Sequence, residues 1–333
     1  MSKIKVAIVG YGNVGRGVHR AVVETEDMQL AGILTRGPRR VKKHLRQQGE
    51  KIPELVNAGV KQNFSETLPA DVAVLCGGSK NDLPEQGPLF ARYYNTVDSF
   101  DTHGEIPGYY KNVGEAAESN GNLSIVSTGW DPGTFSLERI VADAFLPGAV
   151  HHTFWGPGVS QGHSDAARQV RGVEDARQYT LPDEEVMEKI RSGKDLDFTT
   201  ARKHRRVVYV VAEKNADKNR ISREIKNMPE YFEPYRTEVK FINRAEMEAE
   251  HSDYPHGGVV FASGQTSPGK EATIEYRCQW ASNPEATARI LVACARAAFR
   301  LNERGETGAR TLPEIPPAEL SPHSIKKLLA KFM

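Results

Sequence analysis

Three glycines near the start of the chain have the spacing of a phosphate-binding turn. Val6–Val9 is a short apolar run, and it leads directly into the segment GYGNVG at residues 10–15. A strand, a GxGxxG turn and a helix in this order form the dinucleotide-binding βαβ unit, whose glycines allow a tight turn and close backbone approach. The helix start would offer free N–H groups to the phosphates. The cofactor contacts predicted here are Gly10, Tyr11, Gly12, Asn13 and Val14.

The residues after the second predicted strand, Leu30–Leu34, indicate which dinucleotide binds. An NAD site places Asp or Glu about 20 residues past the glycines. This chain has Thr35 and Arg36 there, with Arg39 close behind and no acid. Guanidinium groups match phosphate oxygens, so the loop suits the 2′-phosphate of NADP. We expect Arg36 to bind it with support from Thr35 and Arg39; the alternative is a solvated basic loop.

Strand-like and helical patterns alternate through the first half of the chain. Strands are expected at 72–76, 96–98 and 123–127, with helices over 84–93 and 107–119 between them. This alternation predicts an α/β, Rossmann-type, doubly wound parallel sheet, whose ligands collect beyond the carboxyl ends of the strands. Further cofactor contacts are therefore predicted in the loops that follow these strands, at Gly77, Gly78, Ser79, Ser127, Thr128, Gly129 and Trp130.

The second half lacks a regular crossover helix after each strand. Strand-like runs occur at 207–211, 238–242, 258–261 and 273–276, and the charged stretch Asp183–Lys203 is expected to be an exposed helix and loop. We expect a second α+β domain with a mixed sheet. The predicted domains are 1–127, completed by a C-terminal helical region over 284–330, and 128–283.

Composition excludes several classes of protein. The chain has 333 residues, enough for two domains with cores, and a net charge of +1, which favours neither nucleic acid nor an anionic membrane. Its three cysteines are widely spaced and form no CxxC pair, which favours a reducing compartment. No run approaches the ~18 apolar residues of a membrane span. The expected location is cytoplasmic.

A series of longer motifs resembles one enzyme family. In order, they are GYGNVG (10–15), TVDSFDTH (96–103), STGWDPGTFS (127–136), HTFWGPGVSQGHSDA (152–166), QYTLP (178–182), MPEYF (228–232) and PHGG (255–258). Together they resemble the meso-diaminopimelate dehydrogenases over nearly the whole chain. The resemblance implies NADP-dependent, reversible oxidative deamination at the D-centre of meso-2,6-diaminopimelate. The product would be L-2-amino-6-oxopimelate, which cyclises to tetrahydrodipicolinate, in lysine biosynthesis. The family is commonly dimeric through its second domain, so the resemblance implies a homodimer in which 128–283 is the substrate-binding and dimerisation domain.

Two acids follow strands of the predicted sheet. Carboxylates at Asp101 and Asp131 could hold an amino group by charge-assisted hydrogen bonds. The resemblance assigns that role to these two positions and makes them catalytic candidates together with Trp155, which would wall the pocket. A structural alternative is that Asp131, before Pro132, caps a helix. Trp155 could equally be a core residue.

The distal end of the substrate needs groups that bind a carboxylate. By resemblance these are Arg206, Thr180 and His256, assisted by Asn283, while Gln161 and Gly162 would border the D-centre. Arg206 can grip a carboxylate bidentately. The basic run at 202–206 could instead be a nucleic-acid patch, but an apolar strand follows it and the net charge is near zero.

Metal chemistry is not expected. His151, His152, His163 and Asp165 do not match the common zinc spacings, and hydride transfer needs no metal. The alternative functions are a dihydrodipicolinate reductase, a broader D-amino-acid dehydrogenase and a non-catalytic NADP sensor. The reductase would not be expected to carry TGWDPG and FWGPG. A sensor would not need amino-acid anchors.

Overall fold

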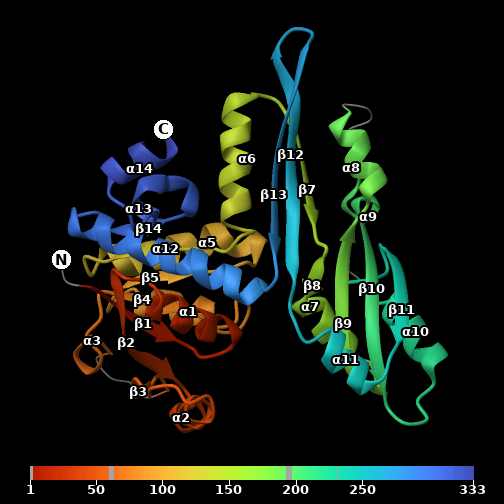
Figure 1. Cartoon of the computed structure of the whole chain (residues 1–333), viewed down its shortest axis with the longest axis horizontal. Helices are drawn as coiled ribbons and strands as arrows, with labels where there is room; N and C mark the ends of the chain where they lie inside the picture. Colours follow the sequence, from red (N-terminus) through yellow and green to blue (C-terminus); the bar gives the residue numbers. More distant parts are fainter. Residues whose placement is uncertain (1–2, 60–63, 193–196, 230) are drawn as a thin grey trace. The chain divides into compact units, whose positions relative to one another are not determined.

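The computed structural model describes residues 3–59, 64–192, 197–229 and 231–333. The chain divides into two compact units, one made of 1–137 with 284–333 and the other of 138–283 (Figure 1). The boundary between them lies a little later in the chain than the 127/128 boundary expected from sequence. Among the described residues, no helix is long and apolar enough to cross a membrane.

The first unit contains one seven-stranded sheet, ordered β14-β6-β5-β4-β1-β2-β3, in which all neighbouring strands are parallel. The strands are β1 (Ile4–Val9), β2 (Met28–Thr35), β3 (Glu54–Asn57), β4 (Val72–Leu75), β5 (Asn95–Asp98), β6 (Leu123–Ile125) and β14 (Gly308–Arg310). This confirms the predicted doubly wound sheet. The two edge strands, β3 and β14, were not predicted.

Helices cover both faces of this sheet. They are α1 (Asn13–Val23), α2 (Pro38–Gln47), α3 (Phe64–Thr67), α4 (Leu83–Phe90), α5 (Ile106–Glu118), α12 (Asn283–Glu303), α13 (Pro317–Leu320) and α14 (Ile325–Phe332), with 3₁₀ turns at His103–Glu105 and Leu312–Glu314. Ile8 and Val74 pack in one apolar cluster, whereas Val9 and Leu75 pack in another. Successive strand residues point to opposite faces, so the sheet is buried on both sides.

The C-terminal helix α12 belongs to the core of the first unit. Its residues Leu291 and Ala295 lie in the same apolar cluster as Ile8. Arg296, also on α12, is buried and grips Asp27 with two hydrogen bonds of 2.7 and 2.8 Å. Such bidentate pairs are among the stronger charge-assisted contacts. A segment far away in sequence therefore helps to hold the βαβ unit.

The second unit has a mixed architecture with two sheets. Its strands are β7 (Val150–Trp155), β8 (Gly158–Ser160), β9 (Val173–Pro182), β10 (His204–Ala212), β11 (Arg236–Phe241), β12 (His256–Ser267) and β13 (Lys270–Trp280). One sheet has the order β11-β10-β9-β8, in which only the β10–β11 pair is parallel, and the other has the antiparallel order β13-β12-β7. This confirms the expected mixed domain.

Helices flank the sheets of the second unit. They are α6 (Thr134–Phe145, which begins in the first unit), α7 (Gln161–Arg168), α8 (Glu184–Arg191), α9 (Thr200–Lys203), α10 (Lys218–Lys226) and α11 (Arg244–Glu250). The stretch Asp183–Lys203 is not simply exposed: Met187 and Ile190 of α8 are buried with Phe261. Residues 193–196 of that stretch lie outside the described residues. An amphipathic helix can carry many charges and still bury one face.

Candidate active site

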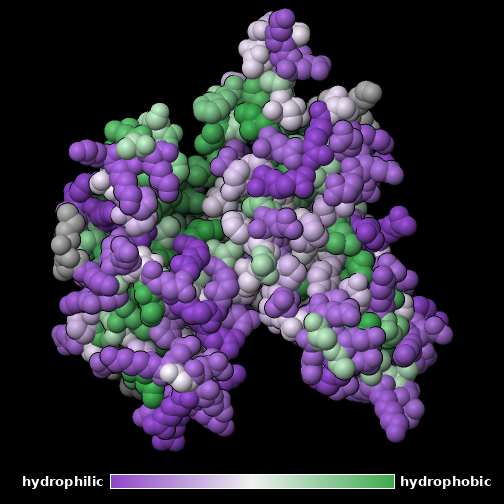
Figure 2. Space-filling view, viewed as in Figure 1, coloured by the Kyte–Doolittle hydropathy of each residue, from purple (hydrophilic) through white to green (hydrophobic). Residues whose placement is uncertain are grey.

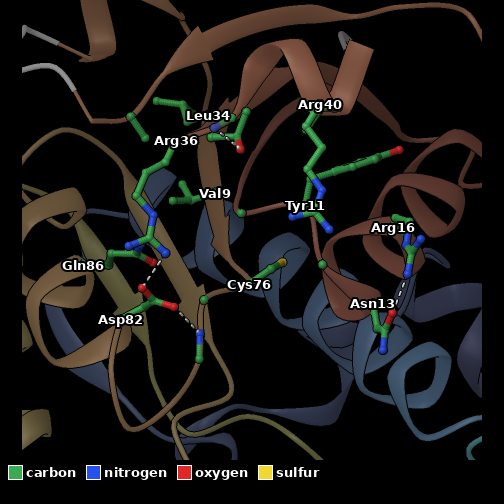
Figure 3. A pocket seen from close by; sticks show the side chains of 18 of the residues that line it. Val9, Tyr11, Asn13, Arg16, Leu34, Arg36, Arg40, Cys76, Asp82 and Gln86 are labelled. Atoms are coloured by element: carbon green, nitrogen blue, oxygen red, sulfur yellow. Dashed lines mark hydrogen bonds and ion pairs between the residues drawn. The ribbon is translucent and has the colours of Figure 1, made fainter. Parts of the chain in front are cut away.

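A cavity of about 600 Å³ lies at the carboxyl ends of β1, β2 and β4 in the first unit (Figure 3). Predicted cofactor residues that line it are Gly10, Tyr11, Gly12, Asn13, Thr35, Arg36, Gly77 and Gly78. Ligands of doubly wound sheets bind beyond the carboxyl ends of the strands. The turn glycines and two of the strand-end loops therefore meet at one cavity.

The turn glycines have the geometry that a bound pyrophosphate requires. Gly10 has φ = +90°, a conformation that side-chain-bearing residues rarely adopt, and a Cβ on Gly15 would overlap the carbonyl oxygen of Gly10. A Cβ on Gly12, in contrast, would meet no atom within 4 Å. Gly12 is the N-cap of α1, and no side chain caps the helix. The open backbone and the helix N-terminus fit a phosphate group.

Arg36 and Arg40 both line the cavity. Arg36 reaches from the end of β2 and donates to the Asp82 carboxylate at 2.9 Å, while the other oxygen of Asp82 accepts from the Gly78 amide at 2.9 Å (Figure 3). Arg40 projects from α2 into the same cavity. Arg39 lies outside it, on a solvent-facing part of α2 with Lys42 and Lys43. The structure thus favours Arg40 over Arg39 as the partner of Arg36.

Three of the predicted cofactor residues belong to the glycine turn itself. The Tyr11 hydroxyl contacts Nδ1 of His19 at 2.7 Å, and burial raises the pKa of Tyr11 to about 12. Asn13 opens α1 and accepts a hydrogen bond from Arg16. Val14 packs partly against the apolar core rather than lining the cavity. Of these three, Tyr11 and Asn13 therefore remain candidates for side-chain contact with a cofactor.

The loops after β4, β5 and β6 carry the remaining predicted residues of the first unit. Ser79 Oγ accepts from the exposed Asp101 backbone amide at 2.8 Å, which joins the first two loops. Ser127 has φ = 56°, and Thr128 is completely buried. In the same loop, Trp130 packs edge-to-face on Phe135, with ring centroids 5.3 Å apart. Gly129 and Asp131 flank Trp130, and the peptide bond after Asp131 is cis. These loops form a second group of polar residues at the carboxyl edge of the sheet.

In the second unit, four predicted residues lie near the place where the two sheets meet. Arg206 on β10 lies opposite Thr180 on β9, and Thr180 lies opposite Gly158 on β8. A Cβ on Gly158 would come 2.6 Å from Cγ of His256, so the histidine packs against this glycine. Trp155 lies opposite Gly258 on β12, close to the same junction. The structure thus brings Arg206, Thr180, His256 and Trp155 together although they come from different strands.

Arg206 is a buried cation without a carboxylate partner among the described residues. Its side chain donates to Thr180 Oγ1, and its guanidinium carbon lies 4.1 Å from the ring centre of Tyr235. The residue is 7% exposed, and its Nε is buried without a hydrogen-bond partner in the described chain. Burial lowers its pKa from the ordinary value. An unmet N–H on a buried cation is strongly disfavoured, so this site fits an anionic ligand.

Trp155 is fixed by His204, a residue that the sequence analysis did not select. The indole stacks on the imidazole with ring centroids 5.3 Å apart, and the Trp155 amide donates to Nε2 of His204 at 2.9 Å. Burial lowers the pKa of His204 to about 4 and that of His163 to about 4. Both imidazoles are therefore neutral at pH 7. His204 could have been noticed from its position two residues before Arg206 on the same strand face.

The other predicted substrate residues are placed only in part. Gln161 is the first residue of α7, but its side chain lies outside what the structure describes. Gly162 is exposed, and a Cβ there would meet no atom within 4 Å. Asn283 is half-buried, and its backbone amide donates to the Tyr254 carbonyl at 2.7 Å. These residues remain predictions.

Comparison with known proteins identifies relatives over the full chain. The family described as "Diaminopimelic acid dehydrogenase C-terminal domain" matches residues 129–282. The meso-diaminopimelate D-dehydrogenase of Ureibacillus thermosphaericus is 47% identical over 333 residues and covers 100% of both chains. The enzyme of the same name from Corynebacterium glutamicum is 44% identical and covers 99% of both chains.

Solved structures agree with this assignment. The diaminopimelate dehydrogenase of C. glutamicum in complex with diaminopimelate superposes with a TM-score of 0.88 at 43% identity, over 100% of both chains. An engineered D-amino acid dehydrogenase bound to NADP⁺ gives a TM-score of 0.83 at 41% identity, again over 100% of both. With relatives this similar over its whole length, the chain belongs to the meso-diaminopimelate D-dehydrogenase family.

Proposed function

We propose that this protein catalyses the reversible, NADP-dependent oxidative deamination of the D-centre of meso-2,6-diaminopimelate. The products are L-2-amino-6-oxopimelate, ammonia, NADPH and a proton, and water is consumed. We place the enzyme in lysine biosynthesis, in the cytoplasm, as a homodimer. The observation that carries the substrate is Arg206, a buried guanidinium with an unmet N–H and no carboxylate partner in the described chain. A substrate with a second carboxylate, far from the reacting carbon, supplies that partner.

The two units then have different tasks. Arg206, Thr180 and His256 bind the carboxylate of the L-centre, and this grip leaves only the D-centre as the reacting end. Asp101 and Asp131 hold the reacting amino group through charge-assisted hydrogen bonds. Trp155, kept in place by His204, forms a wall of the pocket. Catalysis on this view is mainly positioning of one carbon.

The cofactor residues are those around the cavity of the first unit. Gly10, Gly12 and the first turn of α1 hold the pyrophosphate, and Arg36 and Arg40 hold the 2′-phosphate. Bound NADP⁺ supplies the hydride acceptor. One nitrogen of the Arg36 guanidinium donates to Asp82, and its other N–H groups are available for the phosphate. The remaining contacts come from Thr35 and from the loop at Gly77 and Gly78.

The first experiment follows the absorbance of reduced cofactor with meso-diaminopimelate and NADP⁺, beside NAD⁺, the L,L-isomer and D-lysine. We expect strong turnover only with NADP⁺ and the meso form.

Replacement of Arg206 by Met (Arg206→Met) should lower kcat/KM for diaminopimelate about 100-fold, because roughly 3 kcal/mol of charge-assisted bonding is lost. Arg205→Met is the matched control, since Arg205 is the exposed neighbour on β10. Equal loss of NADP⁺ affinity in Arg206→Met would show that Arg206 supports the fold instead.

The cofactor preference should depend on Arg36 and Arg40 but not on Arg39. Arg36→Ala and Arg40→Ala should each reduce the ratio of kcat/KM with NADP⁺ to that with NAD⁺ by about tenfold, the effect of losing one charged hydrogen bond. Arg39→Ala, on the solvent-facing side of the same helix, should leave the ratio unchanged. If only Arg39→Ala changes the ratio, the cavity assignment is wrong.

The oxidative rate should rise with pH because the substrate amine, not the protein, loses the proton. His163 and His204 have pKa values lowered to about 4, so both are neutral well below pH 7 and contribute no titration above it. We expect kcat/KM to increase between about pH 7 and 10, where amines titrate. An inflection near pH 6.5 that disappears in His163→Gln would instead identify His163 as the base.

The expected homodimer is supported by apolar side chains exposed on the second unit. Phe145 on α6 is 70% exposed, and Ile140 on the same helix and Val150 on β7 are also exposed. Figure 2 shows this apolar surface over α6. Exposed apolar patches mark protein interfaces.

Sedimentation of the wild-type protein should give twice the mass of the chain, and the Phe145→Asp variant should sediment as a monomer. Val23→Asp, at an exposed apolar residue of the first unit, should leave the dimer intact; a monomeric wild type would contradict the proposal.

A further inference from the structure

Asp98, the last residue of β5, is the centre of a buried hydrogen-bond network. It is 0% exposed. Its Oδ1 accepts from the Phe100 amide at 2.9 Å and from the Ser127 amide at 3.1 Å. Its Oδ2 accepts from the Tyr109 hydroxyl at 2.8 Å. Its carbonyl oxygen accepts from both the amide and the hydroxyl of Thr128, each at 2.9 Å. One residue therefore binds to two loops and to α5.

These two loops carry the two acids of the proposed site. The loop after β5 leads through Phe100 to Asp101, and the loop after β6 leads through Ser127 and Thr128 to Asp131. The first loop is fixed at Phe100, next to Asp101, and the second at two successive residues. Both acids are therefore held by short stretches of backbone whose near ends bind to the same side chain.

The second loop needs such support because its backbone is strained. Ser127 has φ = 56°, in the left-handed region, which residues with a side chain rarely adopt. Its hydroxyl is buried without a partner among the described residues, so it does not stabilise this conformation. The amides of Ser127 and Thr128 both point to Asp98. These bonds compensate for the strain and set the direction of the chain toward Asp131.

The ionised state of Asp98 also needs explanation. None of its hydrogen-bond partners is basic; burial raises its pKa to about 6, and the two amides and the Tyr109 hydroxyl limit that rise. At neutral pH it is thus a carboxylate held by neutral donors alone. Such a charge is costly to bury and is found more often at functional sites than elsewhere. Tyr109 fixes its rotation, because the tyrosine ring is itself stacked on Phe100 with centroids 4.1 Å apart.

We propose that Asp98 is a positioning residue that holds the loops of Asp101 and Asp131 in the arrangement required for turnover. It contacts neither substrate nor cofactor in this proposal; its side chain acts through the Phe100 and Ser127 backbones, whereas Thr128 binds its backbone carbonyl. The inference rests on the proposed function, because it assigns the two acids to the reacting amino group. It goes further by naming the group that sets their positions.

Three variants separate positioning from simple stability. Asp98→Ala removes both acceptor oxygens. Asp98→Asn retains an acceptor at Oδ1 for the two amides and turns its amide toward the Tyr109 oxygen, which can accept. Thr96→Val is the matched control, because Thr96 lies two residues earlier on β5 and bonds Ser124 of β6 at 2.7 Å. It removes one buried hydrogen bond between the same two strands without touching either loop.

The measurements are kcat and KM for meso-diaminopimelate at saturating NADP⁺, the melting temperature, and the dissociation constant of 2′,5′-ADP, which probes only the phosphate end of the cavity. We expect Asp98→Ala to lower kcat about 100-fold, the scale of a small misplacement of catalytic groups, with 2′,5′-ADP affinity unchanged. Asp98→Asn should keep kcat within about threefold, since its loop bonds remain. Thr96→Val should lower the melting temperature but not kcat.

Two results would overturn the inference: wild-type kcat in Asp98→Ala, or an equal loss of kcat in Thr96→Val. If Asp98→Ala does not fold, Tyr109→Phe serves instead, because it frees the carboxylate to rotate while it keeps the ring on Phe100. It should lower kcat at least threefold with unchanged 2′,5′-ADP affinity, and wild-type kcat in this variant would equally contradict the role. Failure of the proposed function is distinct from both, since wild-type protein would then show no turnover at all.

Discussion

A charged side chain that leaves water loses several kcal/mol of solvation unless the protein replaces it. Each unit of this protein buries one such charge without an opposite charge among its described partners: Asp98 in the first unit and Arg206 in the second. Their surroundings differ in one respect. Every oxygen of Asp98 accepts at least one hydrogen bond, whereas Arg206 keeps a buried Nε without a partner. The hydrogen bonds of Asp98 fix the backbone around it. The unpaired N–H of Arg206 remains available for a ligand.

In each unit, the strand arrangement places the buried charge and its partners. In the first unit, parallel strands end at one edge, so the loops after β5 and β6 start close enough to share Asp98. In the second unit, the cross-strand register aligns Arg206 with Thr180, and Tyr235 covers the guanidinium face. Arg296 on α12 shows the third possibility, a buried cation paired with a carboxylate and a carbonyl. Each of its three guanidinium nitrogens donates to Asp27 or to the Leu320 carbonyl, so that residue supports the fold.

The sequence predicts the fold and some of the cavity lining where a local pattern carries the information. The glycine turn and the arginine after β2 lie in short motifs, and both line the cavity. Features that depend on direction or distance cannot be predicted in this way. Arg39 and Arg40 are neighbours, but one helical step turns the side chain by about 100°, so only Arg40 enters the cavity. Tyr235 and Arg206 meet across many residues of chain, which no spacing rule predicts. Asp98 resembles any acid at the end of a strand until its hydrogen-bond donors are known.

The edge strand β14 has only three residues and comes from the far end of the chain, so hydrophobic periodicity gives no signal for it.

The unmet donor of Arg206 also bears on which amino acids the proposed enzyme accepts. A pocket that is only apolar discriminates weakly between substrates that differ by one group, but a site built to hydrogen-bond that group rejects an analogue without it strongly. Diaminopimelate brings a carboxylate to Arg206, and D-lysine brings none. With D-lysine bound, the guanidinium would be closed off from water and would still lack a carboxylate partner. The loss of binding free energy would then exceed that of one missing contact, because a desolvated donor would stay unpaired. The proposed selectivity for a diamino diacid therefore follows from burial of the cation, whose guanidinium lies over the uncharged ring of Tyr235. Looser packing around Arg206 would let water reach the guanidinium. It would then weaken discrimination even with every anchoring residue in place.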